Sequence, residues 1–348
     1  MFQLRDLSPE FVDILQGNRE LIDSLTERGP DAKLAYWMWM GWGRDKPWDE
    51  RQRIVRETVK QIRERIKEPW VLLPCRANHL DYARELGYVD KSIFFPYAAI
   101  EDEPSPPTTR LRFDEMFDYL NDAISRCGIR SAMGNAQSPL AQLPNIFFFA
   151  ETAWNGVPPE TPEALDVLRP LARLMVSNAS ETLAQGWAML KSQDAAEARA
   201  QAQELQHVAE DDAVGAGVIG RYYFPNVEQL VRDLALQLEV HAAAVELVKA
   251  LQRSEPFGEV LPLVRSYLDA AITWHSVHDF RRYACYGPDV NAIAESWGSY
   301  RAGVTLPDGY IDDLRSGLQA RGFDDWIVNG YVDLLAPAEP EPQPAAEV

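Results

Sequence analysis

The sequence has few cysteines and no long apolar run, and both absences narrow the class of protein. Its three cysteines are widely spaced among 348 residues, so they form neither a disulfide framework nor a metal-ligand spacing. No run approaches the ~18 apolar residues of a membrane-crossing helix. The first residues lack the basic and then apolar pattern of a signal peptide. We therefore expect a cytoplasmic protein without a membrane partner, unless Met1 is not the native start.

Basic residues are scarce relative to acidic ones. The chain has 34 Lys and Arg against 53 Asp and Glu, which gives a net charge of −19. Because a surface this acidic repels phosphate backbones, we expect no nucleic-acid partner. The charge suits a neutral ligand such as a sugar. The hydrophobic fraction of 46% is ordinary for a globular protein, and the length exceeds one typical domain.

The N-terminal part alternates between apolar runs and amphipathic stretches. The runs that we expect to form strands are residues 34–40, 70–74, 91–98 and 129–133. Strands that alternate with helices are typical of a parallel sheet with crossover helices. A complete (β/α)₈ barrel needs eight strands in roughly 250 residues. Four strands therefore predict half a barrel, either the C-terminal part of a longer enzyme or a smaller open sheet.

From residue 158 onward the pattern becomes helical. Apolar stripes at helical spacing, interrupted by Gly and Pro, predict a helical domain over residues 158–335. The tail, residues 336–348, is rich in Pro, Ala and Glu and is expected to be disordered. The predicted fold class is therefore α/β followed by all-α, with a complete or partial (β/α) barrel in residues 1–157 and an appended helical domain.

Ligands of parallel α/β folds bind beyond the carboxyl ends of the strands, so the polar residues that follow each run are candidates. Near the end of the first run, Trp39 offers an aromatic face for a sugar ring, although core packing is an alternative. After the second run, Asn78, His79 and Asp81 combine an amide, an imidazole and a carboxylate. These groups could orient hydroxyls or act as acid and base. A helix cap by Asn78 or Asp81 is equally compatible.

An acidic cluster follows the third run. Glu101, Asp102 and Glu103 are consecutive carboxylates, and Tyr97 precedes them as a substrate-contact candidate. Glycoside hydrolysis uses two carboxylates, one protonated and one ionised. We therefore predict the catalytic carboxylates among these three residues. A solvated acidic loop is the alternative.

Two side-chain amides follow the fourth run. Two motifs elsewhere in the chain do not indicate a cofactor or metal site. Asn135 and Gln137 offer donors and acceptors for sugar hydroxyls, with turn formation before the next proline as the alternative. The GxGxxG pattern at residues 215–220 lacks the preceding strand and following helix of a dinucleotide site. His275 and His278 have no further ligands at a suitable spacing. We therefore expect neither a cofactor nor a metal.

The end of the α/β part carries a family resemblance. The pattern of the family is a strand that ends in small residues and an Asn-Pro-type turn, followed by an apolar helix and a Trp-Asn pair. In this chain the corresponding segments are Gly134-Asn135, Ser138-Pro139, residues 147–150 and Trp154-Asn155. This segment resembles the barrel end of β-N-acetylglucosaminidases of the O-GlcNAcase and bacterial hyaluronidase-like type. The resemblance implies a barrel enzyme acting on an N-acetylhexosamine, followed by a helical domain. It also implies sugar contacts by Asn135 and by the acidic loop.

The chain departs from that family in its acidic pairs. The family carries adjacent aspartates after the fourth barrel strand, one polarising the acetamido group and the other acting as acid and base. Here Asp211-Asp212 and Asp324-Asp325 lie elsewhere. The resemblance therefore implies that the catalytic pair would lie before Met1.

Three functions remain open from the sequence. The leading hypothesis is a glycoside hydrolase, or its C-terminal portion, that acts on a carbohydrate substrate by carboxylate chemistry. A non-catalytic carbohydrate-binding or assembly protein is the first alternative. A metal-dependent hydrolase with His79, Asp81 and Glu101 as ligands is the second. Each of these is compatible with a homo-oligomer.

Overall fold

The chain divides into two compact units, one with short strands (unit 1) and one that is helical (unit 2). The structure is a computed structural model. It describes residues 27, 34–38, 46–65, 70–96, 111–134, 142–210, 214–218, 227–276, 290–323 and 325–335.

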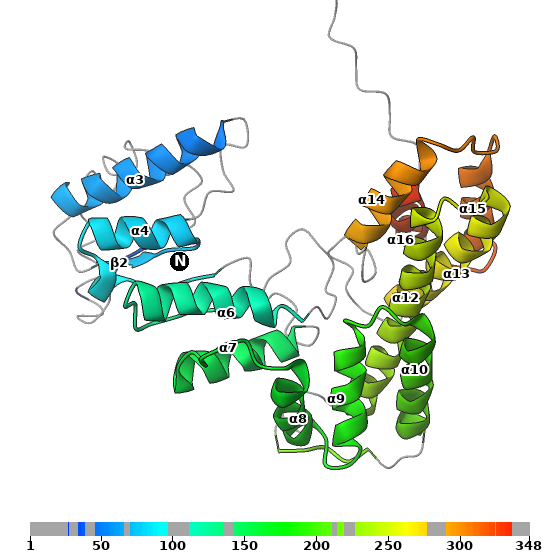
Figure 1. The fold of residues 1–348 in the computed structure, drawn as a ribbon, viewed down its shortest axis with the longest axis horizontal. Helices are drawn as coiled ribbons and strands as arrows, with labels where there is room; N and C mark the ends of the chain where they lie inside the picture. Colours follow the sequence, from blue (N-terminus) through cyan, green and yellow to red (C-terminus); the bar gives the residue numbers. More distant parts are fainter. Residues whose placement is uncertain are drawn as a thin grey trace, which may run out of the picture. The chain divides into compact units, whose positions relative to one another are not determined.

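Unit 1 alternates between strands and helices (Figure 1). Its described elements are β1 (Leu34–Trp37), α3 (Trp48–Arg65), β2 (Trp70–Leu73), α4 (Ala77–Glu85), the 3₁₀ turn η1 (Val89–Lys91), α6 (Phe113–Asn121), the π-helical turn η2 (Asp122–Arg126) and, from Phe148 onward, α7 (Leu143–Asn155).

The strands of unit 1 are parallel and short. β1 and β2 pair over four residues each, with Tyr36 opposite Leu72. Isolated parallel bridges join Leu72 to Ser92 and Phe94 to Ala132. Where they are described, the run expected as the third strand therefore contributes two isolated bridges, and the run expected as the fourth strand contributes one.

One face of these strands packs against α3. Tyr36 and Leu72 are buried in one cluster with Val55, Val59 and Ile62 of α3. The three α3 residues are spaced four and three positions apart, so they lie on one side of the helix. This apolar stripe explains why the otherwise charged α3 packs against the strands.

The opposite face carries the alternate strand residues, because successive side chains of a strand point to opposite sides. Trp37 packs with Leu73, Cys75 and Phe95. The Trp37 and Phe95 ring centroids are 5.6 Å apart. The Trp37 indole Nε1 donates to the Cys75 Sγ over 2.9 Å. This half-buried tryptophan thus keeps a partner for its polar atom.

The prediction of a (β/α) barrel is wrong. In the described residues, two four-residue strands and isolated bridges form an open arrangement, and helices make up most of the rest. A barrel requires strands that pair around a closed circle. Apolar runs between amphipathic helices led to the barrel prediction, but alternation alone does not specify ladder length or closure. The interpretation as a TIM-barrel glycoside hydrolase therefore loses the fold on which it rested.

Unit 2 consists of packed helices. Its described elements are α8 (Ala164–Met175), α9 (Ser180–Met189), α10 (Ala195–Glu210), α12 (Val227–Gln252), α13 (Phe257–Ser276), α14 (Val290–Arg301), α15 (Tyr310–Gln319), α16 (Asp325–Val332) and the 3₁₀ turn η3 (Asp333–Leu335).

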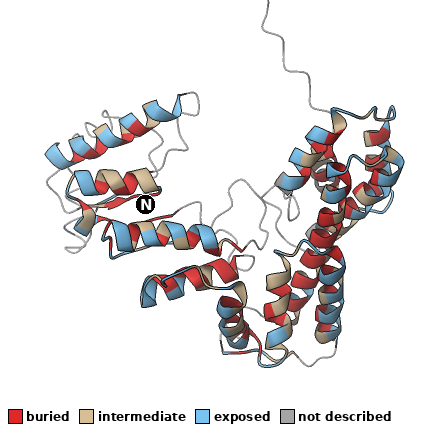
Figure 2. Ribbon diagram, viewed as in Figure 1, coloured by how far each residue is buried: buried red, intermediate tan, exposed pale blue. Residues whose placement is uncertain are grey.

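The 26-residue helix α12 forms the core of unit 2. It has buried residues along its length, from Val227 to Leu251 (Figure 2), and it contacts α9, α10, α13 and α14. A helix that is apolar on several sides is stable in water only when other elements surround it. Among the helices that the structure describes, not one combines the length and the apolar character that a bilayer-crossing segment requires.

Two polar links fix the neighbours of α12. The Arg199 guanidinium of α10 donates two hydrogen bonds to the Glu246 carboxylate of α12, the shorter over 2.5 Å and the longer over 2.6 Å. The Trp274 Nε1 of α13 donates to Asp233 of α12 over 2.9 Å, and Gln237 donates to the same carboxylate over 2.7 Å. Bidentate and shared carboxylates of this kind restrict the angle at which helices pack.

In the GxGxxG segment, the backbone at Gly217 lies close to the backbone at the end of α8. An antiparallel bridge joins Val176 to Ala216, and the Gly217 amide donates to the Met175 carbonyl over 2.8 Å. A Cβ atom at Gly217 would lie 2.4 Å from the Leu174 carbonyl oxygen. Because no side chain fits there without backbone movement, glycine is required for packing.

We predict that Gly217→Ala lowers the free energy of unfolding by about 1–3 kcal/mol, since the added methyl overpacks a backbone contact. Gly317→Ala is the control, because a Cβ at that helical position of α15 meets nothing within 4 Å. It should raise stability by about 0.5–1 kcal/mol through helix propensity. Urea unfolding of both variants checks the prediction; equal effects would contradict it.

Candidate functional site

The candidates that follow β2 have separate environments. His79 is fully buried, and its Nδ1 accepts the backbone N–H of Cys75 over 3.3 Å. The proton of the neutral ring therefore sits on Nε2, which has no hydrogen-bond partner among the described residues. Burial, with a smaller effect of Arg76, lowers the pKa of His79 from 6.5 to about 3. The imidazole is thus neutral at physiological pH.

Asp81 takes part in an exposed ion-pair network. Its carboxylate accepts hydrogen bonds from Arg84 over 3.2 Å and from Arg126 over 3.1 Å, so it links α4 to η2. Asn78 lies half-buried in the first turn of α4. The cap residue of that helix is Arg76, which makes no side-chain cap bond. His79 and Asp81 therefore engage different neighbours, and the predicted sugar contacts of these residues stay predictions.

The other predicted site residues lie outside the described residues. They are Trp39, Tyr97, Glu101, Asp102, Glu103, Asn135 and Gln137. The catalytic assignment to the acidic cluster therefore stays a prediction. In the part of the chain that is described, no three His, Cys, Asp or Glu side chains gather as a metal site. The metal-dependent alternative also needs Glu101 and is likewise untested.

Cys75 is unsuited to nucleophilic chemistry in this environment. Its thiol is buried and donates to the Leu73 carbonyl over 3.3 Å. Burial raises the pKa of the Cys75 thiol to about 12, against a smaller opposing effect of the Trp37 hydrogen bond. Since the thiolate is the reactive form, this cysteine has a packing role.

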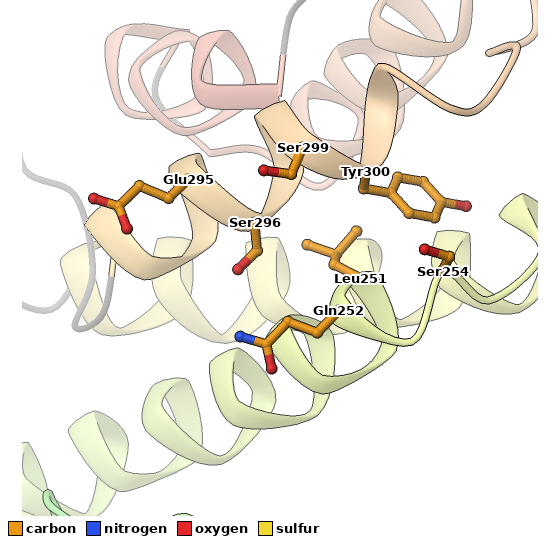
Figure 3. A pocket seen from close by; sticks show the side chains of 7 residues that line it. All are labelled: Leu251, Gln252, Ser254, Glu295, Ser296, Ser299 and Tyr300. Atoms are coloured by element: carbon orange, nitrogen blue, oxygen red, sulfur yellow. The ribbon is translucent and has the colours of Figure 1, made fainter.

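A small polar pocket lies in unit 2, where α12 ends beside α14. Its volume is about 300 Å³, and the lining residues are Leu251, Gln252, Ser254, Glu295, Ser296, Ser299 and Tyr300 (Figure 3). Buried Leu251 and Tyr300 supply apolar surface, while the exposed or half-buried polar side chains surround it. The pocket therefore offers hydroxyl, amide and carboxylate groups around a small apolar patch.

The end of α12 shapes this pocket through a Schellman turn. The Ser254 amide donates to Leu251 over 3.0 Å, and the Glu255 amide donates to Ala250 over 3.2 Å. Ser254 has a φ of 54°, in the left-handed region. Glycine is usual at this position, because a side chain there costs roughly 1–2 kcal/mol. A serine hydroxyl is thus held at the pocket wall at the expense of backbone strain.

Tyr300 anchors the turn to α14. Its hydroxyl donates to the Glu255 carbonyl over 2.8 Å, and its ring is buried. The ring of Trp297 lies 5.9 Å from that of Tyr300 and packs in the core of unit 2. The turn after α12 and the helix α14, which form the two walls of the pocket, are therefore joined by the hydrogen bond of Tyr300, whose ring also packs against Trp297.

A second, smaller pocket of about 200 Å³ lies between α13 and α15. Its floor is Leu268 and Leu314, and Arg265 and Arg321 line its rim. Arg321 is paired with Asp269 and stacks over Phe323. This pocket has no strained residue, so the pocket at the end of α12 is the stronger candidate.

Sequence reasoning missed the pocket at the end of α12. Its walls come from residues 251–254 and 295–300, which are distant in sequence and carry no motif. The available signal was the group of polar residues between the end of a long apolar helix and Pro256. That pattern predicts a helix end, and it does not reveal which helix packs beside it.

Comparison with known proteins identifies no relative: no family model, no curated protein and no solved structure matches the chain. The resemblance to β-N-acetylglucosaminidases therefore stays a prediction. Of the residues that carry it, Trp154 lies at the end of α7 with a 90% exposed side chain. The neighbouring Asn155 amide donates to Glu151 over 2.8 Å.

We predict that stability falls as pH drops from 6.5 toward 3, partly because of His79. In that window the unfolded chain binds a proton at this residue and the folded chain does not. The contribution approaches about 1.4 kcal/mol per pH unit. His79→Asn keeps an acceptor for the Cys75 amide and should have a shallower pH dependence. Urea unfolding at several pH values checks this; parallel curves for both proteins would contradict it.

We also predict that Ser254→Gly raises the free energy of unfolding by about 0.5–1 kcal/mol. The left-handed strain is relieved, and the greater entropy of the unfolded glycine offsets part of the gain. Ser299→Gly is the matched control, because that serine lines the same pocket from within α14. It should lower stability by about 0.5 kcal/mol. A loss of stability in Ser254→Gly would sink the strain argument.

Proposed function

We propose that the chain is a non-catalytic carbohydrate-binding protein whose pocket at the end of α12 holds a small polyhydroxylated ligand. The observation that carries the proposal is Ser254, a serine in the left-handed conformation at the pocket wall. Strained residues of this kind cluster at ligand sites. Glycine would form the same turn with less strain, so the side chain of Ser254 has a use beyond the turn.

The chemistry of the lining residues supports a sugar. Serine hydroxyls at positions 254, 296 and 299 both donate and accept, and the Gln252 amide does the same. Sugar hydroxyls require such mixed donors and acceptors. Figure 3 places Leu251 centrally among these groups, where an apolar C–H face can pack.

The size of the pocket supports a ligand no larger than a monosaccharide or a short polyol. Sites for drug-sized molecules have volumes of about 300–1,000 Å³, and this pocket has about 300 Å³. A small open pocket of this kind suits weak, reversible binding. Millimolar affinity corresponds to about 4 kcal/mol.

Binding without hydrolysis is favoured by the number of carboxylates. Glycoside hydrolysis uses a pair of carboxyl groups. Among the residues that line this pocket, Glu295 alone carries a carboxylate. The pocket therefore has groups to hold a sugar and lacks the pair that would cleave a glycosidic bond.

The proposal predicts a sugar-dependent stabilisation that depends on Ser296. Wild-type protein should melt at a higher temperature with at least one of glucose, galactose, mannose or sorbitol, because a ligand that binds only the folded state stabilises it. Ser296→Ala should weaken binding by about 2- to 10-fold, the equivalent of one neutral hydrogen bond. Isothermal titration gives the affinities.

The control is Ser316→Ala, an exposed serine of α15 that does not line the pocket. It should bind as wild type does. If none of the four compounds binds, or if Ser296→Ala and Ser316→Ala bind equally well, the pocket is not a carbohydrate site.

A further inference from the structure

The first turns of α3 and α4 meet at one aromatic ring. Trp48, the first residue of α3, has an exposed side chain. The guanidinium carbon of Arg51 lies 5.1 Å from the centre of the Trp48 ring. The guanidinium carbon of Arg76, the cap residue of α4, lies 4.9 Å from the same centre. Two positive charges are therefore held at one ring, and we call these three residues the Trp48 cluster.

The two helices lie beside each other and run in the same direction (Figure 1). The Tyr82 hydroxyl of α4 donates to Gln52 of α3 over 3.4 Å. One turn further along both helices, Arg56 pairs with Glu85. Because the partners advance together, both N-termini lie at the same end, which is the carboxyl end of the parallel strand β2 that precedes α4. Ligands of parallel α/β folds bind at this end of the strands.

Buried donors without acceptors lie in the interface between α3 and α4. The Nε2 of His79 and the amide nitrogen of Gln52 are buried and have no hydrogen-bond partner among the described residues. Gln52 lies one helical turn after Trp48. His79 lies one turn after Arg76. Residues at this spacing share one side of a helix, so both unpaired donors belong to the interface that begins at the Trp48 cluster.

The first turn of α4 adds further donors. It contains no acidic residue, and Arg76 makes no side-chain cap bond. The backbone amides of Ala77 and Asn78 have no acceptor among the described residues, as is usual for the first amides of a helix. Arg76 forms no ion pair with the described part of the chain. The first turn of α3, in contrast, contains Asp49 and Glu50. The positive end of α4 is therefore the better position for an anion.

We infer that the Trp48 cluster binds a phosphate group, free or as a monoester, with the two arginines beside the anion and the first amides of α4 donating to its oxygens. Helix N-termini bind phosphate through unpaired amides and the helix dipole, and guanidinium groups match it in bidentate geometry. These groups all donate, which suits a ligand that only accepts. The site lies in unit 1 and does not depend on the carbohydrate-binding function proposed for unit 2.

The expected affinity is modest. Trp48 and Arg76 are exposed, and exposed charge pairs are weak. The net charge of −19 repels anions at long range, although physiological salt screens this repulsion beyond about 8 Å. The local donors therefore decide binding, and we expect a dissociation constant in the millimolar range.

The experiment is an isothermal titration of the full chain with inorganic phosphate and with methyl phosphate, both at constant ionic strength. Wild type should bind at least one of the two. Arg76→Gln should weaken that binding by about 3- to 10-fold, because it removes a charged donor next to the anion. Since Arg76 is exposed, the variant should fold, and its melting temperature without ligand checks this.

Arg56→Gln is the matched control. Arg56 also stacks on an aromatic ring of this interface, 5.3 Å from the centre of Tyr82, but Glu85 neutralises it. The control removes the same charge and the same kind of ring contact, away from the N-terminus of α4. It should bind phosphate as wild type does.

The two probes also separate the sources of the phosphate group. Arg76-dependent binding of methyl phosphate, at least as tight as that of inorganic phosphate, assigns the site to a monoester. Arg76-dependent binding of inorganic phosphate alone assigns it to the free anion. If neither probe binds, if Arg76→Gln binds as wild type does, or if both variants weaken binding equally, the inference is overturned. Sugar binding in unit 2 is unaffected by any of these results.

Discussion

Burial of α12 is the interaction on which unit 2 depends. This helix contacts α9, α10, α13 and α14 and has buried apolar residues along its length. Its removal from water therefore stabilises the interface with each of these four helices. Hydrophobic burial is nondirectional, and it does not by itself set the angle between helices. The carboxylates of Glu246 and Asp233 supply that direction, because each accepts hydrogen bonds from a neighbouring helix.

The pocket is a consequence of where this core helix ends. α12 leaves the core at Gln252, and its last carbonyls are satisfied by the Schellman turn at Ser254. α14 lies beside the turn and supplies Tyr300, its last residue but one, whose hydroxyl donates to the Glu255 carbonyl. The pocket lies between the turn and this end of α14. Polar side chains collect there because the helix end must meet water.

Local periodicity predicted the individual helices better than it predicted their assembly. The helical pattern expected from residue 158 onward became packed helices such as α10, and the amphipathic stretch between the first two apolar runs became α3. The runs at 91–98 and 129–133 suggested strands, yet among the described residues they form isolated bridges in place of ladders. Apolar alternation reports which residues are buried; ladder length and closure depend on partners that are distant in sequence.

The same limit separates the site residues predicted from the sequence from the pocket at the end of α12. A histidine after a strand suggests acid–base chemistry, but burial keeps the His79 imidazole neutral. Ser254 has no such signature, and its left-handed backbone is invisible in a sequence that lacks glycine at that position. Under the proposed function, Ser254 lowers the stability of the folded chain and favours ligand binding. Because α12 has buried residues along its length, unit 2 can tolerate this strain at its surface, and a serine can persist where stability alone would favour glycine.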